Sequence, residues 1–248
     1  MIPNILHYVH ISERPWKLHH YLSVKSAVMR GGFDRIILWT DNLPQGEWWE
    51  RTSKYVEIVR IDPPGEIFGK PITQPAHKSD VIRLQVLLEY GGVYADTDTI
   101  FIKSFDTLLH HRLVLGQQNI SGSEGYCPAI ILSEPNSIFL QKWLEGFKDS
   151  FHGGGPGTDT WCTHSVHYPA FLLEYFKGYV HIMNHEAFFW PLYHENHMKM
   201  LFEEIHEFPN AYSHHLWESS GKRYLEELTV DSILSTDTTF TRAVKDLL

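Results

Sequence analysis

The chain has 248 residues, enough to bury a sizeable core in one α/β domain, with or without a small appendage. Its formal net charge of −9 and its lack of a basic block argue against a nucleic-acid partner. Two cysteines, Cys127 and Cys162, do not make a disulfide scaffold, and no apolar run approaches membrane-spanning length. Because no charged-then-apolar signal segment opens the chain, we expect a cytoplasmic protein.

The first part of the chain alternates strands and helices. We expect strands at Ile5–Ile11, Arg35–Thr40 and Val56–Ile61, and a helix over 18–29 that Gly31 and Gly32 stop. This alternation predicts a doubly wound parallel sheet, in which ligands bind at the carboxyl ends of the strands. The polar residues near such ends are His10, Asp41, Asp62 and Asp96.

The most informative stretch runs from His77 to Lys103. An apolar helix is followed by two glycines, a short apolar strand at 93–95, and then Asp96 and Asp98. In an extended segment these two carboxylates point to the same side and repel each other. A divalent cation such as Mg²⁺ or Mn²⁺ would offset that repulsion, although a bare D-x-D is more often a solvated turn.

The helix before the glycines favours a site. His77, Asp80 and Arg83 recur every three residues and form one polar line on an otherwise apolar helix. A surface ion pair between Asp80 and Arg83 is the alternative, but so apolar a helix should be largely buried. We therefore expect the polar line to face a cavity that also receives the acidic pair.

The second half is less regular. Its expected elements are a strand at Pro128–Leu132, a helix at Ser137–Phe147, a glycine-rich loop at 153–157, a helix over 158–176, a strand at Val180–Met183 and a terminal helix over 229–248. The loop could close over a substrate or be a plain surface linker. Of the 17 histidines, His110, His111, His164 and His167 raise a zinc question, but no zinc-ligand spacing appears.

The pattern A-x-K-S-D-x-x-R, followed by G-G-x-Y-x-D-x-D-x-I-x-x-K, resembles the DXD-containing sugar transferases. These include the fungal initiating α-1,6-mannosyltransferase, the α-1,4-galactosyltransferases and, more distantly, the clostridial glucosylating toxins. The residues that carry the resemblance are Ala76, Lys78, Ser79, Asp80, Arg83, Gly91, Gly92, Tyr94, Asp96, Asp98, Ile100 and Lys103. The resemblance implies one Rossmann-like α/β domain of the GT-A type over 1–248, with a mostly parallel central sheet. Within it, 1–110 would be the nucleotide-sugar half and 111–248 the acceptor half.

The implied activity is the metal-dependent transfer of a hexose from a nucleotide-diphosphate sugar to a hydroxyl of a glycan or other acceptor, with retention. A UDP-sugar is favoured and GDP-mannose is the other candidate donor, with Mn²⁺ or Mg²⁺ as the cofactor. Asp80, Arg83 and Asp98 would be catalytic, and Asp96, Asp98 and His215 would hold the metal, with His214 as a competing ligand. Relatives in the secretory pathway carry an N-terminal membrane anchor. Because the sequence shows no such anchor, we expect a cytosolic enzyme or an excised catalytic domain.

The resemblance also implies a nucleotide-sugar site. Its expected residues are His7, Val9, His10, Asp41, Lys78, Asp80, Arg83, Asp96, Thr97, Ser219 and Ser220. The opening I-P-x-x-I-H matches the family, but His10 and Gly221 stand where Trp is usual, which leaves base recognition open. For a retaining nucleophile, Gln117, Gln118 and Asp159 are candidates, and attack from the leaving-group face is the working hypothesis.

Two other functions remain open at this point. Asp96-Thr97-Asp98-Thr99 also fits the D-x-D-x-T of haloacid-dehalogenase-like phosphatases, but that motif belongs on a first strand and needs a later G-D-x-x-x-D. A catalytically silent nucleotide-sugar or carbohydrate-binding module is the second alternative.

Overall fold

In the computed structural model, which describes residues 1–11, 13–119, 121, 125–155, 158 and 160–248, the described strands include seven in a central sheet. They are β1 (Ile5–His10), β2 (Arg35–Thr40), β3 (Glu57–Arg60), β6 (Gly92–Ala95), β8 (Leu113–Gln117), β9 (Tyr126–Ser133) and β10 (Val180–Met183). Their order is β10-β8-β9-β6-β1-β2-β3, and β9 runs antiparallel to both neighbours while the other pairs are parallel. The expected α/β class with a mostly parallel central sheet is confirmed.

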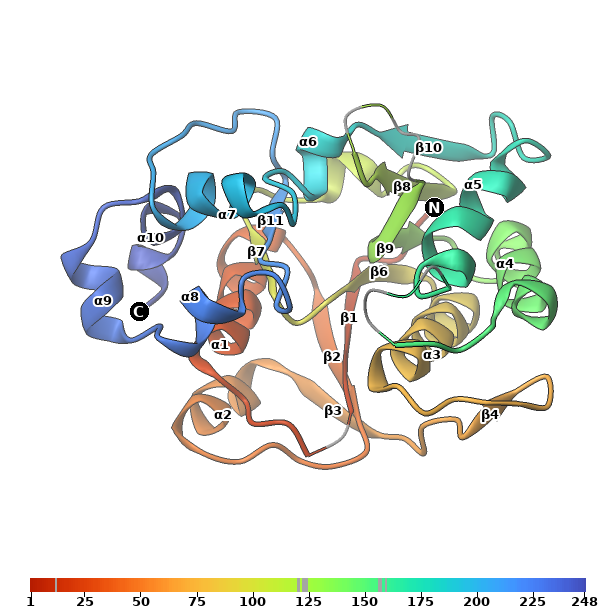
Figure 1. Ribbon diagram of the computed structural model, residues 1–248, viewed down its shortest axis with the longest axis horizontal. Helices are drawn as coiled ribbons and strands as arrows, with labels where there is room; N and C mark the ends of the chain where they lie inside the picture. The colour runs from red at the N-terminus through yellow and green to blue at the C-terminus, as the bar shows by residue number, and fades with distance from the viewer. Residues whose placement is uncertain (12, 120, 122–124, 156–157, 159) are drawn as a thin grey trace.

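Helices cover both faces of this sheet (Figure 1). The described helices are α1 (Leu18–Ser26), α2 (Glu47–Thr52), α3 (Pro75–Tyr90), α4 (Ile138–Ser150), α5 (Tyr168–Leu173), α6 (His185–Phe188), α7 (Glu195–Phe202), α8 (Lys222–Glu226), α9 (Val230–Ser235) and α10 (Thr239–Val244). In the view of Figure 1, α1 and α2 lie on one side of the sheet and α3, α4 and α5 on the other.

Side-chain alternation along the strands builds two separate apolar layers. In β1, Leu6 and Tyr8 belong to the layer that includes Val24 of α1, whereas Val9 belongs to the layer of α3 and α4. Neighbouring strands alternate in the same way, since successive side chains of a strand point to opposite faces. The core of these strands is therefore buried on both sides, as is usual for parallel strands.

A small antiparallel pair of strands ties the C-terminal segment to the end of the central sheet. β7 (Thr99–Phe101) pairs with β11 (Ser213–His215), and Thr99 lies opposite His215. A third apolar cluster fastens this pair to α1 and to the C-terminal helices through Leu22, Ile100 and Leu216. The remaining strands, β4 (Glu66–Ile67) and β5 (Lys70–Pro71), form a short hairpin.

Several sequence-based boundaries were wrong. The helix expected over 18–29 is α1 followed by a π-helical segment, Ala27–Gly31. The helix expected over 158–176 is a π-helical segment, Thr163–His167, that continues as α5 and ends at Leu173. The terminal helix expected over 229–248 is interrupted, because the Thr238 side chain accepts a hydrogen bond from the Thr241 amide and starts a new helix. Within the expected glycine-rich loop, 156 and 157 lie outside the described residues.

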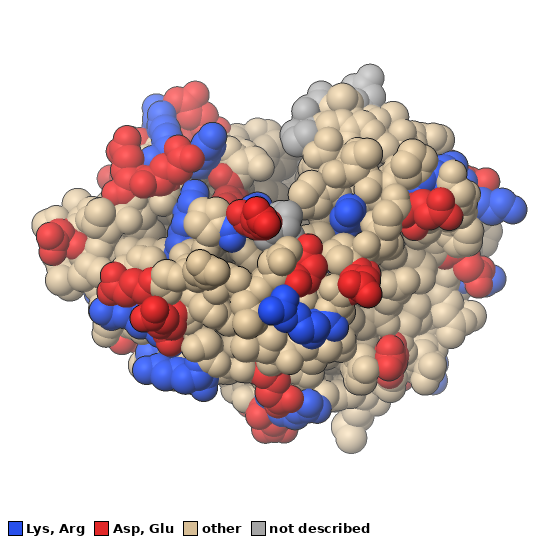
Figure 2. Space-filling view, turned by 90° about the horizontal axis from the view of Figure 1, so that it is seen from below, with Lys and Arg blue, Asp and Glu red and all other residues tan. Residues whose placement is uncertain are grey.

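Acidic and basic side chains are interspersed on the face shown in Figure 2. Among the described residues, none of the helices has both the length and the apolar character that crossing a bilayer requires. The cytoplasmic location stays a prediction.

Gly92 provides a stability test of the junction between α3 and β6. Its φ is +104°, and an added Cβ would lie 2.5 Å from the carbonyl oxygen of Ile5. We expect Gly92→Ala to lower the free energy of unfolding by about 3 kcal/mol, measured by urea denaturation, because both the backbone angle and the contact are unfavourable. Gly65→Ala is the control: the site is exposed, has no atom within 4 Å of the added Cβ, and should change stability by less than about 0.5 kcal/mol. Equal stability of the two variants would contradict this account.

Candidate active site

A cavity of about 640 Å³ opens at the carboxyl ends of central parallel strands of the sheet. Val9 of β1 and Asp96, which follows β6, line it from the carboxyl ends of parallel strands. Cys127 and Ala129 line it from the first half of β9, because that strand runs in the opposite direction. The cavity thus lies where ligands bind in sheets of this kind.

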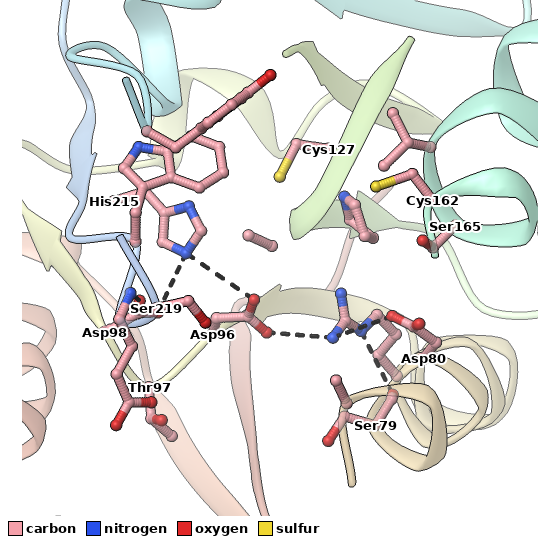
Figure 3. A pocket seen from close by; sticks show the side chains of 18 of the residues that line it. Ser79, Asp80, Asp96, Thr97, Asp98, Cys127, Cys162, Ser165, His215 and Ser219 are labelled. Carbon is pink, nitrogen blue, oxygen red and sulfur yellow. Dashed lines mark hydrogen bonds and ion pairs between the residues drawn. The ribbon is translucent and has the colours of Figure 1, made fainter. Parts of the chain in front are cut away.

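The acidic pair sits in a turn between β6 and β7, not in the extended segment that the sequence predicted. The Thr99 amide donates to the Asp96 carbonyl at 3.1 Å, which closes the turn. The two carboxylates nevertheless converge, and His215 joins them from β11 (Figure 3). His215 Nε2 lies 3.1 Å from Asp98 Oδ1 and 4.0 Å from Asp96 Oδ2.

The electrostatics of this group follow from its burial. Burial would raise the pKa of Asp98, but His215 and the amide of Glu218, which donates to Asp98 Oδ2 at 2.8 Å, lower that pKa to about 2. Burial would lower the pKa of His215, but Asp98 raises it well above its usual value. Burial, with the nearby negative charge of Asp98, raises the pKa of Asp96. In the absence of a bound metal ion, a proton on His215 therefore compensates part of the negative charge of the two carboxylates.

Asp80 and Arg83 extend this charged group along α3. Arg83 Nη2 lies 3.3 Å from Asp80 Oδ1 and 3.3 Å from Asp96 Oδ1, so one guanidinium bridges the helix and the acidic turn. Arg83 is buried, with its guanidinium carbon 4.6 Å from the centre of the Tyr94 ring. Burial alone would lower the pKa of Arg83, but Asp96, Tyr94 and Asp80 together raise it. Arg83 therefore stays charged and joins the two ends of the site.

The donor set at the acidic turn fits a divalent cation. Asp96, Asp98 and His215 each offer one ligand atom, and these atoms all lie within 4.8 Å of one another. Two carboxylates with one imidazole suit Mn²⁺, whereas Mg²⁺ prefers oxygen ligands alone.

Two other groups of side chains are as compact but fit a cation less well. In the first, His19, His20 and Glu218, His20 Nδ1 accepts a hydrogen bond from the Lys17 amide, so its free Nε2 carries the proton in the neutral ring. In the second, Asp80 with His77 and His164, the Arg83 guanidinium already compensates the carboxylate.

The structure places most of the expected site residues at the cavity. Those that line it are Val9, Asp80, Arg83, Asp96, Thr97, Asp98, His215, Ser219 and Ser220. Gln118, one candidate nucleophile, also lines it, whereas Asp159 lies outside the described residues.

Four expected nucleotide-sugar residues do not line the cavity. His7 is fully buried, where Nε2 contacts the Gly91 carbonyl at 2.9 Å and Nδ1 accepts from the Trp39 indole at 3.1 Å, and burial lowers its pKa to about 4. His10 is buried and directs Nε2 at the Arg14 carbonyl. Asp41 and Lys78 are both half-buried outside the cavity lining. Their assignment to the nucleotide-sugar site stays a prediction, and their side chains lie outside the cavity lining because a strand end or a helix position alone does not determine where a side chain points.

The strand β11 places only one of the two candidate histidines beside the acidic pair. Successive side chains of a strand point to opposite faces, so His214 and His215 diverge. His214 is buried, with Nδ1 3.0 Å from the Trp190 carbonyl oxygen, while His215 joins the acidic pair. Gly221, found where the family usually has Trp, would bring a Cβ to 2.6 Å from the Leu216 carbonyl oxygen, so this loop has no room for a side chain there.

Sequence reasoning missed several lining residues. Glu218 lies between Asp98, through its amide, and Arg14, whose Nη1 is 3.5 Å from its carboxylate. Burial, followed by the charge of Asp98, raises the pKa of Glu218. Aromatic side chains of Trp161, Tyr193 and Trp217 also line the cavity. The signal for Glu218 was its place inside the segment that carries His215.

Comparisons with known proteins agree with this site. A family model described as "Glycosyltransferase sugar-binding region containing DXD motif" matches residues 21–115. Glucan organizing enzyme 1 of Cryptococcus neoformans var. grubii serotype A (strain H99) is 32% identical over 268 residues, covering 100% of this chain and 71% of that protein. An uncharacterized protein of Arabidopsis thaliana is 34% identical over 73 residues, 29% of this chain and 11% of that protein.

Among solved structures, the PaToxG glycosyltransferase is similar with a TM-score of 0.49 and 14% identity, covering 99% of this chain and 87% of that one. The region that the family model matches, 21–115, contains Asp80, Arg83, Asp96 and Asp98. The first strand of the sheet carries no acidic D-x-D, which removes the basis for the phosphatase alternative. The protein is a glycosyltransferase that belongs to the family whose sugar-binding region contains a DXD motif.

Proposed function

We propose that the protein transfers a hexose from a nucleotide-diphosphate sugar, in first place a UDP-sugar and otherwise GDP-mannose, to a hydroxyl of a glycan. The observation that carries this is the continuous charged group from Asp80 through Arg83 and Asp96 to His215, inside one cavity. The name of the cryptococcal relative, glucan organizing enzyme 1, supports a polysaccharide-like acceptor. Family membership supports a nucleotide sugar as the donor.

Asp96, Asp98 and His215 would hold Mn²⁺, or Mg²⁺ in its place. When bound, such an ion supplies positive charge that stabilises the diphosphate leaving group. Ser219 and Ser220 line the same cavity and would offer their hydroxyls to the diphosphate. Binding of the ion would also release the proton from His215, because a ligating imidazole nitrogen must be unprotonated.

Asp80 and Arg83 would bind the hydroxyls of the donor sugar. Both are buried on α3 and held in place by contacts of their own, so their positions are fixed before the sugar arrives. A fixed carboxylate and guanidinium would orient the ring and its anomeric carbon, and such positioning lowers the barrier by several kcal/mol. Trp161, Tyr193 and Trp217 offer apolar ring faces to the remaining sugar surface.

The carboxylates that line the cavity favour retention by same-face attack over retention by a carboxylate nucleophile. Among the described residues that line it, Asp96 and Asp98 are the proposed metal ligands, and Asp80 is paired with Arg83. Glu218 lies near Arg14 at 3.5 Å. We therefore favour a mechanism in which a diphosphate oxygen takes the proton of the acceptor hydroxyl. The anomeric configuration of the product, read by proton NMR, tests retention, and an inverted product would refute this mechanism.

We further propose that 1–248 acts as one glycosyltransferase domain, with donor contacts mainly in 1–110 and acceptor contacts mainly in 111–248. In support, Trp161, Ser165 and Val166 line the side of the cavity contributed by the second half. His215, Ser219 and Ser220 are exceptions, since the second half supplies them to the donor side.

Asp98→Ala tests the metal assignment. We expect nucleotide-sugar hydrolysis, measured over a panel of UDP- and GDP-sugars with Mn²⁺, to fall about 1,000-fold, because several kcal/mol of leaving-group stabilisation would be lost. Asp34→Ala is the control, since Asp34 is exposed beside the amino end of β2, at the other edge of the sheet. Full metal-dependent turnover by Asp98→Ala would refute the assignment. Metal-dependent UDP binding without turnover of any donor in the wild type would favour a silent module.

The adjacent histidines allow a matched comparison. We expect His215→Asn to weaken Mn²⁺ binding, measured by calorimetry in the presence of UDP, by roughly 100-fold through loss of a ligand. His214→Asn should leave Mn²⁺ affinity within about twofold and lower thermal stability instead, because His214 contacts the Trp190 carbonyl away from the acidic pair. The reverse pattern would exchange their roles.

A further inference from the structure

His164 contacts Asp80, the carboxylate that is proposed to bind the sugar. Its Nε2 lies 2.9 Å from Asp80 Oδ2, and the imidazole is fully buried. Arg83 contacts the other oxygen, Oδ1, at 3.3 Å. Asp80 is thus held at both oxygens by two side chains from different segments.

The surroundings of His164 determine which atom donates. Nδ1 is buried without a hydrogen-bond partner, so a charged imidazolium would leave one N–H unsatisfied. A neutral ring with its proton on Nε2 leaves only a lone pair unpaired and donates that proton to Asp80. Arg83 and this hydrogen bond, acting against the effect of burial, lower the pKa of Asp80.

The His164 ring is itself fixed by packing. The rings of His77, Phe147 and Phe151 surround it, with centroid separations of 4.8, 4.9 and 5.0 Å. The Trp143 indole of α4 donates to the His164 carbonyl at 2.7 Å, which holds the backbone. These contacts leave His164 little freedom to turn away from Asp80.

His164 also belongs to the segment that forms the opposite wall of the cavity. It lies in the π-helical segment Thr163–His167, in which Ser165 and Val166 line the cavity. Figure 3 shows Ser165 across the cavity from Asp96 and on the same side as Asp80. The ring that holds Asp80 and the wall that faces the acceptor side are therefore parts of one short stretch of chain.

We propose that His164 is a positioning residue, which holds Asp80 in the orientation that accepts the hydroxyls of the donor sugar. It also couples that orientation to the position of the segment Thr163–His167 in the cavity wall. This inference rests on the proposed function, because it assigns the sugar to Asp80. Through its hydrogen bond, His164 acts on the sugar and not on the nucleotide. A role confined to folding would instead affect UDP and UDP-sugar binding alike.

The test compares two variants of the full chain with Mn²⁺ present. His164→Phe keeps an aromatic ring in the aromatic pocket but removes the donor, whereas His164→Gln keeps an amide donor that reaches a similar position. We expect H164F to lose about tenfold in kcat/KM and in affinity for UDP-glucose, or for the donor that wild-type turnover selects, with affinity for the free nucleotide diphosphate unchanged. H164Q should recover most of this loss. In an Asp80→Ala background, H164F should add little, because Asp80→Ala already removes the acceptor of this hydrogen bond.

The outcomes separate this inference from the function on which it rests. Equal weakening of nucleotide and nucleotide-sugar binding by H164F, or full additivity with Asp80→Ala, would overturn the positioning role while wild-type turnover still supports the function. A wild type that binds no UDP- or GDP-sugar would overturn both. If H164F does not fold, His164→Asn, whose shorter amide does not reach Asp80, takes its place, and equal sugar-dependent binding in H164N and H164Q would then refute the proposal.

Discussion

The site depends on one buried guanidinium. Arg83 lies between Asp80 on α3 and Asp96 after β6, and it contacts both at 3.3 Å. Without it, carboxylates would be crowded at the end of a buried strand, and removing one partner of such a buried pair typically costs about 3–5 kcal/mol. The position of Arg83 in turn requires α3 to be buried, and the two glycines after α3 reverse the chain so that β6 delivers Asp96 to the same guanidinium.

His215 is the second group that compensates the negative charge of the carboxylates, and its position depends on contacts between distant parts of the chain. β7 continues from the acidic turn, and β11, more than 100 residues later, pairs with it so that His215 lies opposite Thr99. The Leu216 amide also donates to the Asp98 carbonyl at 2.9 Å, which fixes the register. A proton on His215 and a bound cation would therefore be alternative ways of compensating the same two carboxylates, and the proposed metal ligands would be in place before a cation binds.

The parts of this arrangement that the sequence predicted are the local ones. The alternation of strands and helices predicted β1, β2 and the sheet class, and the three-residue spacing on α3 placed Asp80 and Arg83 on one buried line. The direction of a side chain at a strand end was not predictable, since His7 and His10 bond to nearby backbone carbonyls within the core. The choice between His214 and His215 needed the register of β11, which is set by pairing with β7 and not by local propensity. The sequence raised only a zinc question for His164 and gave no sign of its contact with Asp80, because the two residues lie 84 positions apart.

The shared use of Asp96 has a mechanistic consequence. One oxygen of this carboxylate faces Arg83 and Tyr94, and the other faces His215. Charge that enters at the metal ligands is therefore felt by the guanidinium proposed to contact the sugar, and the reverse also holds, because binding couplings are reciprocal. A donor with both a diphosphate and a hexose would engage both ends of this group at once, whereas a free nucleotide or a free sugar would engage one. For the proposed donor, the charged network would favour the intact nucleotide sugar over either of its parts, and the fixed spacing between Asp80 and Asp98 would set how far the sugar hydroxyls lie from the diphosphate.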